Sequence, residues 1–76
     1  MNEKFYESLG NILKNRRIAK KLSQEKVGEM LGFTKATVSY WESGKRKIYA
    51  DTLKDYCRIL GCLPQDVFSE MDDDSK

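Results

Sequence analysis

A pair of short helices separated by only three residues is the feature that most restricts how this chain can fold. Ser23 is a suitable N-cap for a helix from Gln24 to Leu31, because its hydroxyl can accept a hydrogen bond from the first turn. Gly32 is suited to end that helix, since glycine adopts the left-handed conformation without a Cβ penalty. Thr34 can then cap a second helix from Lys35 to about Ser43. Because the turn is so short, the two helices must pack against each other.

Apolar residues at helical spacing predict three more helices, and no convincing alternating pattern predicts a strand. A first helix should begin between residues 5 and 8 and continue to about Lys20, and a fourth should run from about Asp51 to Leu60. A short fifth helix of a turn or two should begin at Pro64, whose fixed φ suits a first helical position. The apolar residues that place these helices are Phe5, Leu9, Ile12, Leu13, Leu53, Tyr56, Cys57, Leu60, Val67 and Phe68. The sequence therefore predicts a compact all-α fold of four or five helices.

The chain has 76 residues, which is the size of one small domain. We expect residues 1–70 to form that domain. We expect residues 71–76, which include Asp72-Asp73-Asp74, to form an acidic, disordered tail.

The composition removes most kinds of catalytic site. Histidine is absent, and only Cys57 and Cys62 carry thiols, so a Ser/His/Asp triad and a four-ligand Cys/His zinc site cannot be built. Two cysteines five residues apart could form a disulfide or a redox pair, but Cys57 falls on an apolar helical stripe, where a free thiol packs as a small hydrophobic side chain. We interpret the pair as packing residues and expect no enzyme activity, no metal and no cofactor.

Charge is divided unequally along the chain. Residues 1–50 carry 11 Lys/Arg against 5 Asp/Glu, a net charge of +6, whereas residues 51–76 carry 3 against 7, a net charge of −4. This asymmetry indicates that the first half meets an anionic partner. No segment has the length of a transmembrane helix or the pattern of a signal peptide, so we expect a cytoplasmic protein and no membrane partner.

The string SQEKVGEMLGFTKATVSYWESGKRK resembles the helix-turn-helix of the lambda repressor and Cro family, also called the xenobiotic response element (XRE) family. The resemblance covers about residues 9–68 and combines Ser23-Gln24, the Gly32 turn, Trp41-Glu42 followed by a glycine, and Arg17. It implies a lambda repressor-like DNA-binding domain, with the helix-turn-helix formed by the second and third helices. It also implies a structural ion pair between Arg17 and Glu42 that holds the first helix against the third.

Three positions depart from the family pattern. Gly28 stands where alanine is usual, Arg16 where an apolar residue is common, and Leu63 where serine or threonine usually precedes the fifth helix. Glycine in place of alanine costs a helix about 0.5 to 1 kcal/mol, although it still permits the third helix to approach closely.

A helical projection of residues 35–43 places Val38 and Trp41 inward and the small and polar side chains outward. The resemblance implies that this outward side contacts base edges in the major groove, with a lysine able to donate to guanine and a methyl group able to contact thymine. The base-reading candidates are Lys35, Ala36, Thr37, Ser39 and Tyr40. The alternative for each of them is an ordinary solvated helix surface.

We expect phosphate contacts around the helix of residues 35–43. They should come from the N-terminus of a helix and from the basic loop that follows residue 44. The candidates are Ser23, Gln24, Thr34, Ser43, Lys45, Arg46 and Lys47. The alternative for the lysines and the arginine is that they only keep the surface soluble.

These features together predict a sequence-specific, double-stranded DNA-binding transcriptional regulator that represses by occupying an operator. One domain reads only a few base pairs, so we expect a homodimer on a palindromic operator, associating through the last two helices. The alternative is a small protein-interaction module, such as an antitoxin-like partner or regulatory subunit, with secondary DNA binding.

Overall fold

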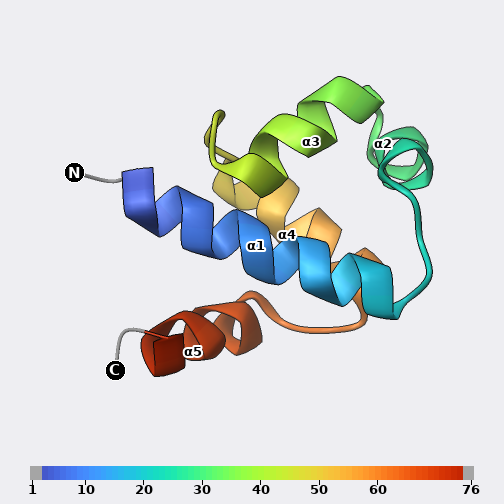
Figure 1. Ribbon diagram of the computed structural model, residues 1–76. Coiled ribbons are helices and arrows are strands. Elements are labelled where there is room, and N and C mark those ends of the chain that lie inside the picture. Colours follow the sequence, from blue (N-terminus) through green and yellow to red (C-terminus); the bar gives the residue numbers. More distant parts are fainter. Residues whose placement is uncertain (1–2, 75–76) are drawn as a thin grey trace.

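Five helices make up the computed structural model, which describes residues 3–74 (Figure 1). They are α1 (Glu3–Ala19), α2 (Gln24–Leu31), α3 (Lys35–Ser43), α4 (Ala50–Leu60) and α5 (Pro64–Asp74). Residues 3–74 contain no strand, so the prediction of an all-α fold is confirmed.

The helix bounds agree best with the sequence where caps are strong. Ser23 Oγ accepts a hydrogen bond from Lys26 N at 3.0 Å, and Gly32 has a φ of +81°, so α2 begins and ends where the sequence predicts. α1 starts earlier than expected, at Glu3, and α4 starts one residue earlier, at Ala50.

α5 is longer than the predicted turn or two. It continues to Asp74, so residues 71–74 are helical although the sequence assigned them to the tail, and residues 75–76 lie outside the described part of the chain. Leu63 lacks a side-chain oxygen that could cap this helix. Instead the Asp66 carboxylate accepts a hydrogen bond from Leu63 N at 2.9 Å, which is one half of a capping box.

α1 is the central helix, and it packs against α3, α4 and α5 (Figure 1). It approaches α3 tightly at Gly10, where a Cβ atom would lie 2.6 Å from the backbone oxygen of Glu42 and still closer to that of Trp41. Only glycine leaves room for this contact between two backbones. Gly10 therefore fixes the position of α1 along α3, a role that the sequence interpretation did not assign.

One hydrophobic core joins all five helices. Its buried members are Leu9, Ile12, Leu13, Val27, Val38, Trp41, Ile48, Leu53, Tyr56, Cys57, Leu60 and Val67. Phe5, which the apolar spacing placed with this set, is 45% exposed and packs edge-on against Tyr6 instead. The prediction that Cys57 packs in the core is confirmed, since its side chain is fully buried as a free thiol.

The second departure from the family pattern, Arg16, contacts α5. Arg16 Nε donates to Glu70 Oε2 at 2.7 Å, and both side chains remain partly exposed. An ion pair in water contributes little free energy, so this pair orients α5 more than it stabilises the fold.

Candidate nucleic-acid interface

α2 and α3 form the predicted helix-turn-helix. Val27 and Val38 are fully buried where the two helices meet, and the Phe33 ring packs against Trp41 at a centroid distance of 4.9 Å. Thr34 Oγ1 accepts a hydrogen bond from Thr37 N at 3.1 Å, which caps α3 as the sequence predicts. The inner side of α3 is thus fixed by packing and its start by a cap.

The turn requires glycine at position 28. A Cβ atom there would lie 2.7 Å from the backbone oxygen of Phe33, and Phe33 N donates to Gly28 O at 2.8 Å. Alanine would therefore push the backbone of the turn outward. Glycine at position 28 weakens the helix, but it also lets the backbone of the turn pack directly against α2.

The base-reading candidates belong to α3, which runs along one edge of the molecule (Figure 1). Lys35, Ala36 and Tyr40 are exposed, while Thr37 and Ser39 are half-buried. The Thr37 hydroxyl lies 3.0 Å from that of Thr34, so it already has a hydrogen-bond partner. The most accessible candidates are therefore Lys35, Ala36 and Tyr40.

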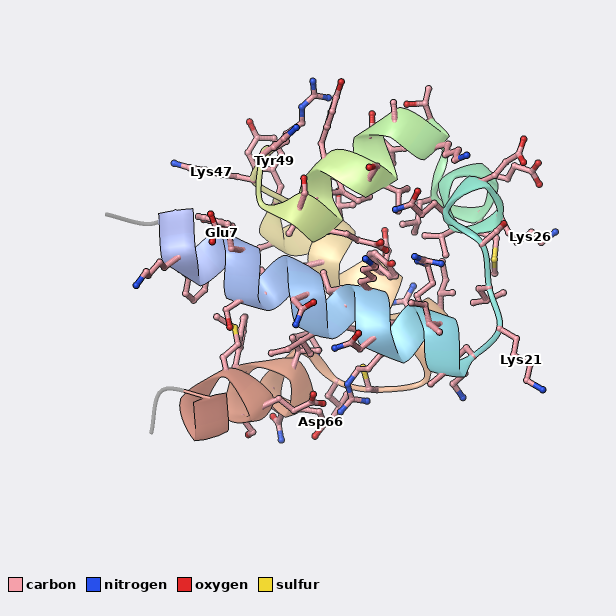
Figure 2. The ribbon with its side chains drawn as sticks, in the orientation of Figure 1. Glu7, Lys21, Lys26, Lys47, Tyr49 and Asp66 are labelled. Atoms are coloured by element: carbon pink, nitrogen blue, oxygen red, sulfur yellow. The ribbon has the colours of Figure 1, made fainter. Side chains whose placement is uncertain are left out.

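The basic loop, residues 45–47, folds back on the end of α3. The backbone oxygen of Tyr40 accepts hydrogen bonds from Lys45 N at 2.9 Å and Arg46 N at 3.2 Å. The Arg46 guanidinium lies 5.0 Å from the centroid of the Tyr40 ring, within the range of a cation–π contact. All three basic side chains are exposed, and the ammonium group of Lys47, which is labelled in Figure 2, lies 5.7 Å from the centroid of the Tyr6 ring of α1.

A hollow of about 180 Å³ lies beside this loop. It brings Thr37 of α3, Arg46 and Lys47 of the loop, and Thr52 of α4 together with aromatic side chains that include Tyr49. Tyr49 is 77% exposed. The sequence interpretation missed Tyr49 and Thr52, because the apolar pattern of α4 begins after them.

The other phosphate candidates already have contacts inside the chain. Ser43 Oγ donates to the backbone oxygen of Tyr40 at 3.3 Å, and the Ser23 and Thr34 hydroxyls serve as caps. Gln24 is half-buried, and its Nε2 donates to Glu42 Oε1 at 3.0 Å. These side chains hold the interface in shape, and the basic loop supplies its accessible positive charge.

Behind α3, four side chains from four helices form what we call the Glu42 cluster. Arg17 donates to the Glu42 carboxylate twice, from Nε at 2.7 Å and from Nη2 at 3.0 Å, so the ion pair implied by the family resemblance is present. Tyr56 OH donates to Glu42 Oε2 at 2.6 Å, and Gln24 provides the fourth bond. Arg17 also donates from Nη1 to the backbone oxygen of Leu22 at 2.7 Å.

The Glu42 cluster is buried and fully paired. Glu42 is 6% exposed and Arg17 7%, and the described side chains include no buried nitrogen or oxygen atom without a partner. Burial opposes ionisation of Glu42, but hydrogen bonds from Arg17, Tyr56 and Gln24 outweigh it, so the pKa of Glu42 lies below its usual value. Burial, together with the neighbouring carboxylate, raises the pKa of Tyr56. The cluster therefore holds an ionised carboxylate at neutral pH.

Two features of the sequence point to parts of this cluster. A buried tyrosine usually needs a hydrogen-bond partner, so a tyrosine in the apolar stripe of α4 pointed to a polar group in the core. Gly10 lies on the same side of α1 as Leu13 and Arg17, at helical spacing. That glycine marked the side of α1 that meets another helix.

Within residues 3–74, no helix is both long and apolar enough to cross a membrane. Over the same residues, no group of three or more potential metal ligands comes together.

Two solved structures of the clp gene regulator ClgR from Corynebacterium glutamicum are similar to this chain. Both are 26% identical over 86% of the chain, with TM-scores of 0.82 and 0.81, and the match covers 69% and 83% of the two ClgR chains. Structures of HppE, one with Fe(II) and the alternative substrate (S)-1-HPP and one apo, have TM-scores of 0.70 and 0.74 at 27% and 25% identity. The match covers 76% and 82% of this chain but only 30% and 34% of those HppE chains, so the likeness concerns one part of HppE.

No curated protein gives a significant match to the sequence. A family model described as helix-turn-helix (HTH_3) matches residues 13–67, which is well over half of the chain. That segment begins in α1, contains the whole Glu42 cluster and ends in α5. The chain therefore belongs to the XRE-type helix-turn-helix family of DNA-binding transcriptional regulators.

Proposed function

We propose that this protein binds a specific double-stranded DNA sequence and represses transcription by occupying an operator. One observation carries the proposal: α3 exposes small and polar side chains on its outer side, while its inner side is held rigidly by Val38, Trp41 and the Glu42 cluster. A rigid helix with an adaptable outer surface is what entry into a major groove requires. Nothing in this role requires catalysis.

Base recognition is assigned to the outer side of α3. Lys35 lies at its N-terminal end, where it can donate to guanine O6 and N7, and Ala36 can contact a thymine methyl group. Tyr40 can reach a base edge or a phosphate through its hydroxyl. Thr37 and Ser39 complete the set, with smaller accessible surfaces.

Phosphate contacts are assigned to the two ends of the helix-turn-helix. At one end are Lys45, Arg46 and Lys47 of the basic loop, with Ser43 beside them. At the other end are Ser23 and Gln24 at the start of α2, and Thr34 at the start of α3. Such contacts position the protein on the duplex without reading its sequence.

A homodimer on a palindromic operator is the assembly we propose. Leu63, in the turn before α5, and Phe68 of α5 are 57% and 39% accessible, and Ile59, Cys62 and Met71 are half-buried. These residues belong to α4, α5 and the turn between them, away from the outer side of α3. Two domains related by a twofold axis would place half-sites about 34 Å apart.

Selection of bound sequences from a random duplex pool, at about 0.15 M salt, tests this proposal directly. We expect a motif with twofold symmetry and a spacing of one helical turn between its halves. A pool that remains random after several rounds, with a protein partner recovered from cell extract instead, would favour the role of an interaction module.

A further inference from the structure

The two cysteines lie at opposite ends of the turn that closes α4. Cys62 N donates to the backbone oxygen of Cys57 at 3.0 Å, and Gly61 N donates to that of Arg58 at 3.1 Å. Gly61 has a φ of +75°. These bonds define a Schellman motif, in which the side chains of the residues in the positions of Cys57 and Cys62 usually contact each other.

The backbone bond also sets the distance between the two residues. With 3.0 Å between the amide of Cys62 and the oxygen of Cys57, bond lengths limit the Cα separation to about 7 Å or less. A disulfide needs a Cα separation of about 4.4 to 6.8 Å. Cys57 is fully buried, and Cys62 is half-buried and packs against the same hydrophobic core.

We propose that Cys57 and Cys62 form a dithiol site that a small disulfide oxidant, such as glutathione disulfide, closes to an intramolecular disulfide across the turn from α4 to α5. In the first step the Cys62 thiolate attacks glutathione disulfide, forms a mixed disulfide and releases one glutathione. In the second step Cys57 loses its proton to solvent, and its sulfur attacks the Cys62 sulfur and expels the second glutathione. The two cysteines together lose two hydrogen atoms, and the oxidant is reduced to two glutathione molecules.

The two thiols have different roles because their surroundings differ. Cys62 is the accessible thiol and reacts first. Burial, followed by interactions with Cys62, raises the pKa of Cys57 to about 12, so little of its thiolate is present at neutral pH and the second step is slow. The charged groups that face Cys57 are Arg16 of α1, which lowers its pKa, and Asp66 of α5, which raises it.

Closing the disulfide would fix the turn that leads into α5. That turn precedes Leu63 and Phe68, which are exposed on the surface proposed for dimerisation. The inference about the thiols themselves does not depend on DNA binding, because it follows from the geometry of the turn.

The full chain, incubated with glutathione disulfide and then quenched with acid, tests the proposal by intact-mass measurement and alkylation after unfolding. We expect a monomer that has lost two hydrogen atoms, carries no glutathione and resists alkylation until it is reduced. The closure rate should rise about tenfold per pH unit between about pH 7 and about pH 9, as the thiolate fraction of Cys57 grows.

Two variants assign the steps. Cys57→Ser should stop at a stable adduct with one glutathione on Cys62, and Cys62→Ser should remain unmodified while folded. A wild-type chain that stops at the glutathione adduct without closing to the disulfide, or that yields a dimer linked through Cys62, would overturn the proposal. That measurement uses the unaltered protein, so it holds even where a variant folds poorly.

Discussion

The two sides of α3 differ in burial and in their contacts with the other helices. On the inner side, Val38 and Trp41 are buried, and Glu42 accepts hydrogen bonds from three other helices. On the outer side, Ala36 and Tyr40 are exposed. The contrast separates the residues that hold the fold from those that we propose to contact DNA, within one nine-residue helix. Substitutions on the inner side should change stability, and those on the outer side should change DNA affinity.

The largest effect is expected from Arg17→Ala. It leaves the Glu42 carboxylate buried without its main partner, which should reduce the free energy of unfolding by about 3 to 5 kcal/mol. Urea unfolding followed by circular dichroism measures it. Arg58→Ala is the matched control, because Arg58 pairs with Asp55 on the surface, and its effect should stay within about 0.5 kcal/mol. Equal effects of the two substitutions would mean that the buried pair of Arg17 with Glu42 stabilises the fold no more than a surface pair does.

Tyr56→Phe should have the next largest effect. It keeps the ring in the core but removes one hydrogen bond to a buried carboxylate, worth about 1.5 to 3 kcal/mol in the free energy of unfolding. Tyr40→Phe removes an exposed hydroxyl and should leave unfolding unchanged. If Tyr56→Phe is as stable as the wild type, the hydroxyl of Tyr56 contributes nothing to the Glu42 cluster.

On the outer side, Lys35→Ala should weaken binding to the selected DNA site by about 1 to 3 kcal/mol and relax base preference, with no change in unfolding. Lys45→Ala, in the basic loop, should instead weaken binding to all sequences alike and lower the slope of log affinity against log salt by about one. Fluorescence anisotropy on matched and scrambled duplexes separates the two effects. Identical behaviour of the two variants would contradict the division between base and phosphate contacts.

Gly28→Ala should reduce stability by about 1 kcal/mol, although alanine is the better helix former by about 0.5 to 1 kcal/mol. The added Cβ would meet the backbone oxygen of Phe33 at 2.7 Å, and that backbone can move only by opening the turn. Thermal unfolding measures the change. An increase in the unfolding temperature would show that the turn can relax around a methyl group.

The smallest effect we expect is a decrease in the free energy of unfolding at acid pH, as Glu42 becomes protonated. The pKa of Glu42 is lowered in the folded protein, so the stability it contributes is present above the unfolded value of about 4.3 and is lost as pH falls through the folded value. The urea midpoint should therefore fall more steeply below about pH 4.5 in the wild type than in Glu42→Gln. Equal slopes for the two proteins would assign acid sensitivity to other carboxylates.

The sequence predicts most of the fold because its helix signals are local. Ser23, Gly32 and Thr34 act through backbone bonds to near neighbours, so α2 and α3 begin and end as expected. No such signal marks the start of α1 or the end of α5. Both helices are therefore longer in the structure than the sequence predicts.

The candidate site is harder to predict from the sequence than the fold is, because it depends on contacts between residues of different helices. The pairing of Arg17 with Glu42 came from the family resemblance alone. The bonds from Gln24 and Tyr56 to that carboxylate join residues 18 and 14 positions away, and helical periodicity does not encode such contacts. The place of Tyr49 beside the basic loop likewise emerges only once α4 is placed.

The carboxylate of Glu42 has a consequence for how the molecule opens. One side chain connects α1, α2, α3 and α4, so their slowest amides should exchange with solvent through a single shared event. α5 is outside this connection, and it is attached by Val67 and Met71, which pack on the core, and by the partly exposed ion pair of Arg16 with Glu70. We therefore expect α5 to behave as an independent unfolding unit, which detaches and rebinds many times before the other four helices open once.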